Sequence, residues 1–219
     1  GMQSAPAQSH SIPDSLNTII NSAASDSVKI EAYTQLFNFH YRKLKIKEAS
    51  DVANKSLDFS LKCKNKKGIA DSYNNLAITM SEMGKLAEAK KYFLLSLEMR
   101  RELNDKKFLA KTLGNLGSLH SKMGVYPESI QYFMESLKLR EEIRDSSGWA
   151  NTMYLLGVAY KNMGDVNSSL SYFKASLKIY EAKKDKKQLA VVLNGLGNSY
   201  LKSNDLDSAL SCFTEACRI

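Results

Sequence analysis

The chain has 219 residues, of which 43% are hydrophobic and 25% are charged, and its formal net charge is +8. No apolar run is long enough for a signal-peptide core or a membrane-spanning helix, so we expect no membrane contact by this segment itself. The three cysteines, Cys63, Cys212 and Cys217, are odd in number and lack a CxxC spacing, which argues against a disulfide framework and favours buried fillers.

The first residues differ in character from the rest of the chain. Residues 1–13 are polar and interrupted by prolines, which predicts a disordered leader. Residues 14–24 place Leu16, Ile19 and Ile20 on one face, which predicts a short helix that packs onto the following segment. Strand-type alternation is absent, so the sequence predicts an all-α fold. The compartment stays open between the cytoplasm and, if a signal was removed, the periplasm.

From residue 27 onward, one pattern recurs every 40 residues without insertion or deletion. The predicted repeats are 27–67, 68–107, 108–147, 148–187 and 188–219. The recurring columns are a leucine (Leu76, Leu116, Leu156, Leu196), a small residue (Ala77, Gly117, Gly157, Gly197) and a phenylalanine (Phe93, Phe133, Phe173, Phe213). The first repeat is degenerate, because Phe37 and Leu44 replace its small residue and its glycine.

Each repeat carries two amphipathic helices, here named helix A and helix B. In the second repeat, Tyr73, Leu76 and Ala77 mark the buried face of helix A, and Ala89 and Phe93 mark that of helix B. A glycine between the two helices is expected to adopt a left-handed conformation and reverse the chain. This column contains Gly84, Gly124, Gly164 and Asn204. Residues that can cap the next helix A share another column, with Ser25, Asn65, Asp105, Asp145 and Asp185.

These columns resemble the tetratricopeptide repeat, whose unit has a large residue, a leucine and a small residue, a turn glycine, and then alanine and phenylalanine. The usual period is about 34 residues, so the extra residues are expected to lengthen the end of helix B and the start of the next helix A. The resemblance implies an all-α, right-handed α-solenoid of about five helix–turn–helix repeats, forming one domain over residues 14–219. Long repeats of this kind resemble those of cargo- and regulator-binding adaptors and of bacterial sensor proteins.

The resemblance also implies a binding groove lined by the helices A. Carried onto this chain, the groove residues are Asn74, Ile78, Lys111, Ser118, Lys122, Asn151, Tyr154, Val158, Lys161, Asn194 and Asn198. The asparagines of this set suit an extended peptide, because an amide both donates and accepts hydrogen bonds. The lysines would attract an acidic partner. An exposed groove can also be polar without binding anything, and this alternative stays open.

The sequence gives little support for catalysis, a metal or a cofactor. His40 and His120 occupy a column that holds Tyr160 in a later repeat, so we expect them to pack as rings between helices. No HExxH, P-loop or nucleophile-elbow motif is present. The glycines at 114–117 and 195–197 lie within helix A without a preceding strand, which argues against a nucleotide loop. We therefore expect a protein that is not an enzyme.

Lysines gather at the turns between repeats, and they leave nucleic acid as a third functional hypothesis. They are Lys62, Lys64, Lys66, Lys67, Lys106, Lys107, Lys183, Lys184, Lys186 and Lys187. Solvated turns that complement the carboxyl ends of the helices B explain the same pattern. A nucleic-acid surface would also need interleaved aromatic or arginine side chains, and these turns have few.

The leading functional expectation is a protein- or peptide-binding module that forms the sensor or scaffold part of a larger bacterial signalling or regulatory protein. The segment Pro13–Leu16 and the repeat junctions of the Asp-Lys-Lys type resemble such proteins. The alternative is a free-standing cytoplasmic adaptor, similar to a co-chaperone scaffold. We also expect the natural protein to continue beyond Ile219, and the open last repeat to favour end-to-end self-association.

Overall fold

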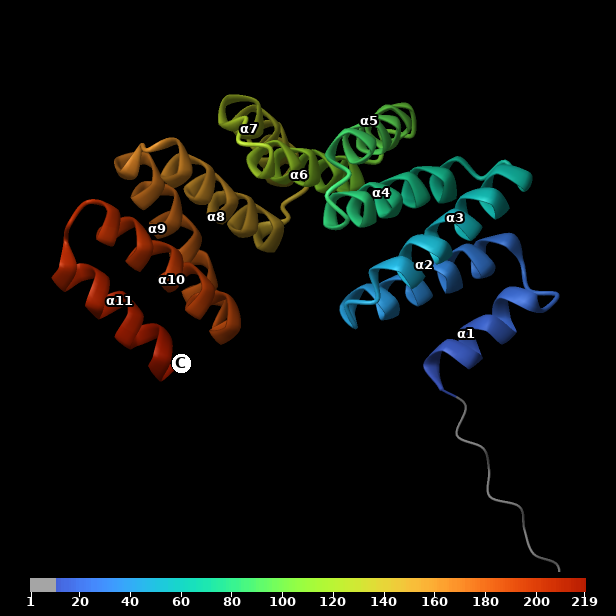
Figure 1. Cartoon of the computed structure of the whole chain (residues 1–219), viewed down its shortest axis with the longest axis horizontal. Helices are drawn as coiled ribbons and strands as arrows, with labels where there is room; N and C mark the ends of the chain where they lie inside the picture. The colour runs from blue at the N-terminus through green and yellow to red at the C-terminus, as the bar shows by residue number, and fades with distance from the viewer. Residues whose placement is uncertain (1–10) are drawn as a thin grey trace, which may run out of the picture. The chain divides into compact units, whose positions relative to one another are not determined.

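The structure is a computed structural model that describes residues 11–219, and this part of the chain contains eleven helices and no strand (Figure 1). The helices are α1 (Ile12–Asn21), α2 (Asp26–Arg42), α3 (Ile46–Lys62), α4 (Lys66–Glu82), α5 (Leu86–Glu102), α6 (Lys106–Lys122), α7 (Tyr126–Glu142), α8 (Ser146–Met163), α9 (Val166–Lys183), α10 (Lys186–Lys202) and α11 (Leu206–Arg218). Residues 1–10 of the predicted leader lie outside the described residues. The predicted helix 14–24 begins earlier, at Ile12, because Ser11 caps it in a reciprocal capping box with Asp14.

The chain divides into two compact units. The N-terminal unit ends at Met99 and the C-terminal unit begins at Arg100, within α5. Even-numbered helices from α2 to α10 are the predicted helices A, and odd-numbered helices from α3 to α11 are the helices B. Helices α2 to α10 each have 17 or 18 residues, so the 40-residue period is divided almost equally between two long helices.

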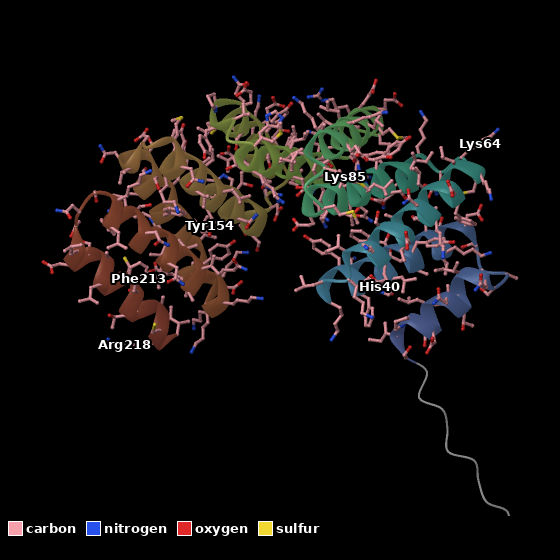
Figure 2. All side chains as sticks on the ribbon, viewed as in Figure 1. His40, Lys64, Lys85, Tyr154, Phe213 and Arg218 are labelled. Carbon is pink, nitrogen blue, oxygen red and sulfur yellow. The ribbon has the colours of Figure 1, made fainter. Side chains whose placement is uncertain are left out.

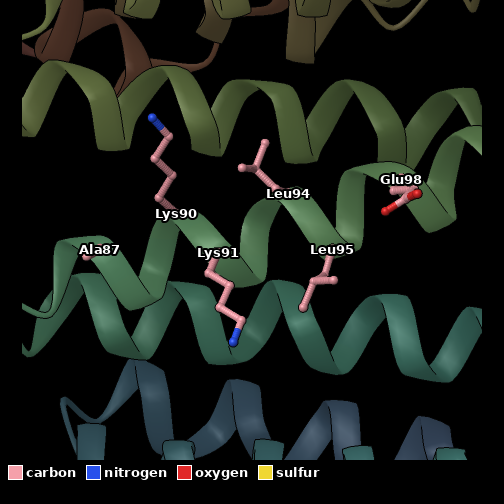
Figure 3. A pocket seen from close by; sticks show the side chains of 6 residues that line it. All are labelled: Ala87, Lys90, Lys91, Leu94, Leu95 and Glu98. Atoms are coloured by element: carbon pink, nitrogen blue, oxygen red, sulfur yellow. The ribbon is translucent and has the colours of Figure 1, made fainter.

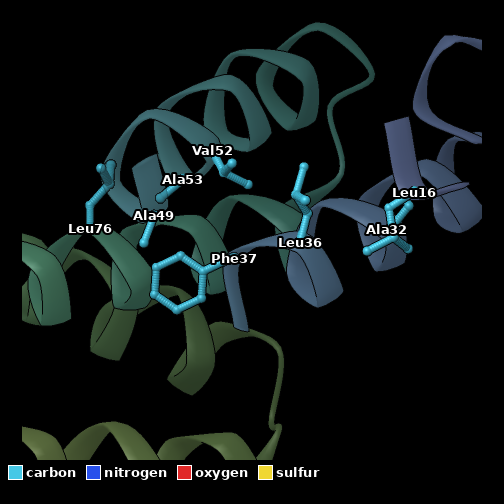
Figure 4. Packing of buried hydrophobic residues seen from close by; sticks show 8 residues of the cluster. All are labelled: Leu16, Ala32, Leu36, Phe37, Ala49, Val52, Ala53 and Leu76. Atoms are coloured by element: carbon cyan, nitrogen blue, oxygen red, sulfur yellow. The ribbon is translucent and has the colours of Figure 1, made fainter. Parts of the chain in front are cut away.

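In the N-terminal unit, α1 packs onto α2, as the sequence predicts. The buried cluster contains Leu16 of α1 together with Ala32, Leu36, Phe37, Ala49, Val52, Ala53 and Leu76 (Figure 4). Phe37 stands where later repeats have a small residue, and it is 3% exposed. Its ring stacks on Tyr41 with 5.8 Å between centroids. The degenerate first repeat therefore fills its core with an aromatic ring instead of a close helix contact.

In the C-terminal unit, the phenylalanine of each helix B lies against the glycine of the preceding helix A. A Cβ atom at Gly157 would lie 2.7 Å from Phe173 Cδ1, and one at Gly117 would lie 2.6 Å from Phe133 Cδ1. Real Cβ atoms do not approach so closely, so the missing side chain is what lets the two helices meet. The predicted role of this glycine column as a site of close helix approach is confirmed.

The small-residue column of helix B contributes a hydrogen bond as well as space. The hydroxyls of Ser96, Ser136 and Ser176 each donate to a backbone carbonyl of the preceding helix A at 2.8 Å. The acceptors are the carbonyl oxygens of Ala70, Ala110 and Ala150. Each serine is fully buried, so this bond satisfies a polar group that would otherwise be costly to bury.

The turn column behaves as predicted. Gly84 and Gly124 have φ of +77°, Gly164 has +101° and Asn204 has +61°. A second left-handed column was not predicted, because it lies at the junctions between repeats and contains no glycine. Its members are Lys64, Asn104, Arg144 and Lys184.

Most of the predicted caps are confirmed. Asn65 and Asp145 accept hydrogen bonds from the backbone N–H groups of Gly68 and Gly148, and the equivalent Asp105 and Asp185 also cap their helices. The prediction is wrong for Ser25, which stands at the N-cap of α2 but makes no capping hydrogen bond with its side chain. Asp26, the first residue of that helix, provides negative charge at the same end.

Two of these cap residues also hold the preceding helix B. Arg140 Nη1 lies 2.6 Å from Asp145 Oδ2, and Arg100 Nη1 lies 2.9 Å from Asp105 Oδ2. Arg100 is 1% exposed, and its guanidinium lies 4.7 Å from the centre of the Phe108 ring. One carboxylate thus caps the next helix A and neutralises an arginine, which joins consecutive repeats electrostatically.

Replacing Gly124 with valine is expected to lower the free energy of unfolding by about 1–2 kcal/mol, because a β-branched residue is strained at positive φ. A Cβ atom there would meet nothing within 4 Å, so the cost comes from the backbone alone. Urea denaturation of the two proteins measures it. Gly124→Asn is the matched control and should cost little, since Asn204 holds the equivalent turn. Equal stability of the valine variant and the wild type would contradict this assignment.

Candidate functional site

The helices A of the C-terminal unit present a face without acidic residues. No aspartate or glutamate lies within α6, α8 or α10, whereas eight lysines do. The acidic residues nearest to these helices in sequence, Asp105, Asp145 and Asp185, are engaged as caps. The neighbouring helix B α7, in contrast, carries four glutamates. Because α6 contacts α8 and α8 contacts α10, the three helices form a continuous surface, here named the A-face.

Six of the predicted groove residues are exposed on the A-face. They are Lys111, Ser118, Lys122, Asn151, Asn194 and Asn198. Lys161 is half-buried, and its backbone carbonyl accepts a hydrogen bond from Lys202 Nζ at 2.7 Å. The A-face therefore brings lysine and asparagine side chains together over three helices.

Two predicted groove residues, Tyr154 and Val158, pack against a buried cluster of α8, α9 and α10 that includes Val192 and Leu196. Tyr154 is labelled in Figure 2. Its ring lies 5.4 Å from the ring of Phe173, between centroids. Burial raises the pKa of the Tyr154 phenol, in agreement with its half-buried position. These side chains shape the A-face by closing one part of it.

The predicted groove residues of the N-terminal unit are less accessible. Asn74 is 7% exposed, and its amide nitrogen lies 3.5 Å from Asn75 Oδ1. Ile78 is half-buried. Asn74 and Tyr154 occupy equivalent positions in their repeats, and Tyr154 also packs against neighbouring side chains. This position is therefore not exposed to solvent in every repeat. Asn74 is therefore not an open-surface amide of the kind that the sequence suggested.

A pocket of about 300 Å³, here named the anchor pocket, opens between α6 and α8. It is lined by Ser118, Ser121, Lys122, Phe133, Leu155, Val158 and Asn162. The structure thus brings the predicted residues Ser118, Lys122 and Val158 to one place. Leu155 and Asn162 were missed, because their columns lie beside those taken from the family pattern. The short side chains of Ser118 and Ser121 on the opposing helix were the available signal.

A second pocket, of about 390 Å³, belongs to the N-terminal unit and is lined by residues of α5 alone (Figure 3). Lys90 and Leu94 project to one side of this helix, and Lys91 and Leu95 project to the other. Glu98 gives the lining an acidic charge as well. Side chains of both charges that come from a single helix B do not converge on one point, which makes this pocket a weaker candidate than the A-face.

A third pocket, of about 260 Å³, has a leucine floor and a charged rim. Arg101 and Glu135 of this rim lie 3.7 Å apart, between Nη2 and Oε2. Glu142 Oε2, also on the rim, lies 3.2 Å from Lys106 Nζ. These rim charges already have partners of opposite sign, so the pocket offers a ligand less unbalanced charge than the A-face does.

His40 and His120 pack as rings. His120 is 4% exposed and lies edge-on to Tyr132 with 5.0 Å between centroids, and His40 lies edge-on to Phe39 at 5.6 Å. Within residues 11–219, no group of three histidine, cysteine, aspartate or glutamate side chains is placed to hold a metal ion. None of the described helices combines the length and hydropathy that a bilayer span requires.

The lysines at the junctions between repeats are dispersed among hydrogen-bond partners and acids. Lys106 pairs with Glu142, and Lys183 Nζ donates to Ser147 Oγ at 2.6 Å. Lys64 itself forms one of the left-handed turns (Figure 2). Four of the junction lysines, Lys106, Lys107, Lys186 and Lys187, are also the first residues of α6 and α10, so in the C-terminal unit the junctions and the A-face share these lysines.

Comparison with solved structures shows the same fold in proteins of low sequence identity. BtubC (BKLC) from P. vanneervenii is 18% identical with a TM-score of 0.77, covering 88% of this chain and 80% of that one. A Rap protein complexed with competence and sporulation factor is 14% identical with a TM-score of 0.78, covering 95% and 58%. A STAND signal-transduction ATPase with a tetratricopeptide repeat sensor, from Pyrococcus horikoshii, is 18% identical with a TM-score of 0.75, covering 90% and 31%.

This chain thus spans little more than half of the Rap protein and under a third of the STAND protein. At these identities the likeness concerns the fold alone. No curated protein sequence matches the chain. The family model of the tetratricopeptide repeat, however, matches residues 68–142, 108–182 and 149–219, in the 40-residue frame described above. With its paired helices, glycine turns and buried phenylalanine column, the chain belongs to the tetratricopeptide repeat family.

Proposed function

We propose that this chain is a protein-binding module whose A-face holds an extended, acidic segment of a partner. The observation that carries the proposal is the absence of aspartate and glutamate from all three helices A of the C-terminal unit, which carry eight lysines, four of them at the junctions where α6 and α10 begin. An acidic segment gains attraction from the lysines of such a surface and meets no carboxylate that belongs to these three helices. The same charge pattern disfavours a basic partner.

The exposed asparagines support an extended backbone as the bound element. Asn151 lies on α8, and Asn194 and Asn198 lie one turn apart on α10. Each amide can donate to a peptide carbonyl and accept from a peptide N–H, whatever the side chains of that peptide are. Backbone recognition by asparagine and charge selection by lysine would then act together.

Two of the similar structures support a role in regulation. One is a Rap protein complexed with competence and sporulation factor, and another is a signal-transduction ATPase with a tetratricopeptide repeat sensor. We infer that this chain serves as the sensor or scaffold part of a signalling protein. A free-standing adaptor is the alternative, and it would use the same surface.

The test uses a fluorescein-labelled probe, Gly-Ser-Glu-Asp-Leu-Asp-Glu-Ser-Gly, and fluorescence anisotropy. Lys111→Glu is expected to raise the Kd about tenfold, since it replaces attraction with repulsion on the A-face. Replacing Asn194 and Asn198 together with alanine should raise the Kd about fivefold while the helical circular dichroism stays unchanged, because both side chains are exposed.

The matched control is Lys178→Glu, which makes the same charge change at an exposed site on the helix B α9. It should leave the Kd within about twofold of the wild type. Equal losses in Lys111→Glu and Lys178→Glu would show that only net charge matters and would contradict the A-face. Tighter binding of a duplex oligonucleotide than of the peptide would favour a nucleic-acid partner instead.

A further inference from the structure

We propose that the anchor pocket between α6 and α8 receives one aliphatic side chain of the bound acidic segment and thereby sets the register in which that segment lies on the A-face. This inference rests on the function proposed above. It adds a residue class to the partner: leucine, isoleucine, valine or methionine, flanked by aspartate or glutamate.

The pocket exists because α6 has small residues where α8 has large ones. Gly114 and Ser118 of α6 are the repeat equivalents of Tyr154 and Val158 of α8. Gly114 is buried, and a Cβ atom there would meet only Ser136 Oγ, at an ordinary contact distance of 3.7 Å. Ser118 lines the pocket itself, and its short side chain leaves room beside Leu155 and Val158 of α8.

The pocket has an apolar floor and a polar rim. Phe133, 1% exposed, contributes the floor together with Leu155 and Val158. The rim contains two serines, Lys122 and Asn162. No acidic residue lines the pocket. An aliphatic side chain would be dehydrated on the floor, and a carboxylate next to it in the segment would lie near the lysine.

The equivalent place between α8 and α10 has a different lining, which is why the pocket can define a register. Val158 stands there in place of Ser118, and Gly195 and Asn198 replace the apolar Leu155 and Val158 of the floor. The Phe173 ring in that place packs on Tyr154 and lies against Gly195. Lys202, the equivalent of Asn162, reaches across from α10 to the carbonyl oxygen of Lys161. A segment shifted by one repeat along the A-face would therefore lose its recess.

The experiment is a peptide array built on the acidic probe, in which the central leucine is replaced by each other amino acid. Wild-type protein is expected to bind the leucine, isoleucine, valine and methionine peptides at least tenfold more tightly than the glycine, serine or lysine peptides. Ser118→Leu fills the pocket from the protein side. This variant should reduce the preference for aliphatic residues to less than twofold. It should still bind the peptides through the acidic residues that flank the central position.

Ser171→Leu is the matched control, since it makes the same change at an exposed site on α9. It should keep the full preference. If circular dichroism shows that Ser118→Leu does not fold, Leu155→Ala is the second test. It widens the pocket and should therefore shift the preference of the central position toward phenylalanine and tryptophan. Unchanged preference in every soluble pocket variant would overturn the inference.

Failure of the anchor and failure of the proposed function give different results. If wild-type protein binds all central residues equally and Lys111→Glu still weakens binding, the A-face stands and the anchor is overturned. If no acidic peptide of the array binds, the proposed function itself is overturned. The same holds if a peptide with lysines in place of its aspartates and glutamates binds more tightly than the acidic probe.

Discussion

Replacing Phe173 with alanine is expected to lower the free energy of unfolding by about 3–5 kcal/mol. The ring is fully buried and makes three kinds of contact: it lies against Gly157 of its own repeat, against Gly195 of the next, and under the Tyr154 ring. Its removal leaves a cavity that two backbones and one aromatic ring would have to close. Urea denaturation followed by circular dichroism measures the loss.

The control for this cavity is Phe213→Ala at the equivalent position of α11. Phe213 is only half-buried, although it meets Gly197 in the same way that Phe173 meets Gly157. The substitution should therefore lower the free energy of unfolding by about half as much.

Phe173→Ala should also broaden the unfolding transition of the C-terminal unit, because each repeat contacts mainly its neighbours. A loss no larger than that of Phe213→Ala would contradict the central position assigned to Phe173.

Gly157→Ala is expected to lower the free energy of unfolding by about 3 kcal/mol, at the upper end of what overpacking costs. The added Cβ atom would lie 2.7 Å from the Phe173 ring, and that ring cannot retreat because a Cβ atom at Gly195 would lie only 2.8 Å from it on another side. The usual gain in helix propensity from glycine to alanine, about 1 kcal/mol, is too small to offset this collision.

Gly114→Ala is the matched control for that substitution. Both glycines lie inside a helix A, but a Cβ atom at Gly114 would meet only Ser136 Oγ, at an ordinary contact distance of 3.7 Å. Gly114→Ala should thus raise stability by up to about 1 kcal/mol. Thermal unfolding of the two variants should shift in opposite directions. Shifts of the same sign would show that Gly157 is not required for the close approach of α8 to Phe173.

The sequence could predict the repeat frame because each column has a local physical reason. The turn glycines occupy left-handed positions, and aspartates or an asparagine cap four of the helices A, as expected. The second left-handed column could not be predicted in this way. Lys64, Arg144 and Lys184 adopt positive φ without the residue type that signals it, and only Asn104 in this column is of a type that favours it.

The candidate site was predictable in outline and not in detail. The family pattern placed lysines and asparagines on the helices A, but it treated each column as equivalent in every repeat. Whether a member is open depends on the side chains around it: Tyr154 packs on Phe173, while Ser118 lines the anchor pocket. The absence of acidic residues from α6, α8 and α10 was readable from the sequence once the helix bounds were known.

The most direct test of the peptide-binding account is a ¹H–¹⁵N NMR titration of the whole chain with the acidic leucine peptide. The account predicts that the side-chain amide signals of Asn151, Asn194 and Asn198 shift on binding, together with backbone amides of α6, α8 and α10. Signals from α7, α9 and α11 should move little. Shifts concentrated on those helices B, or no shift at millimolar peptide, would contradict the account.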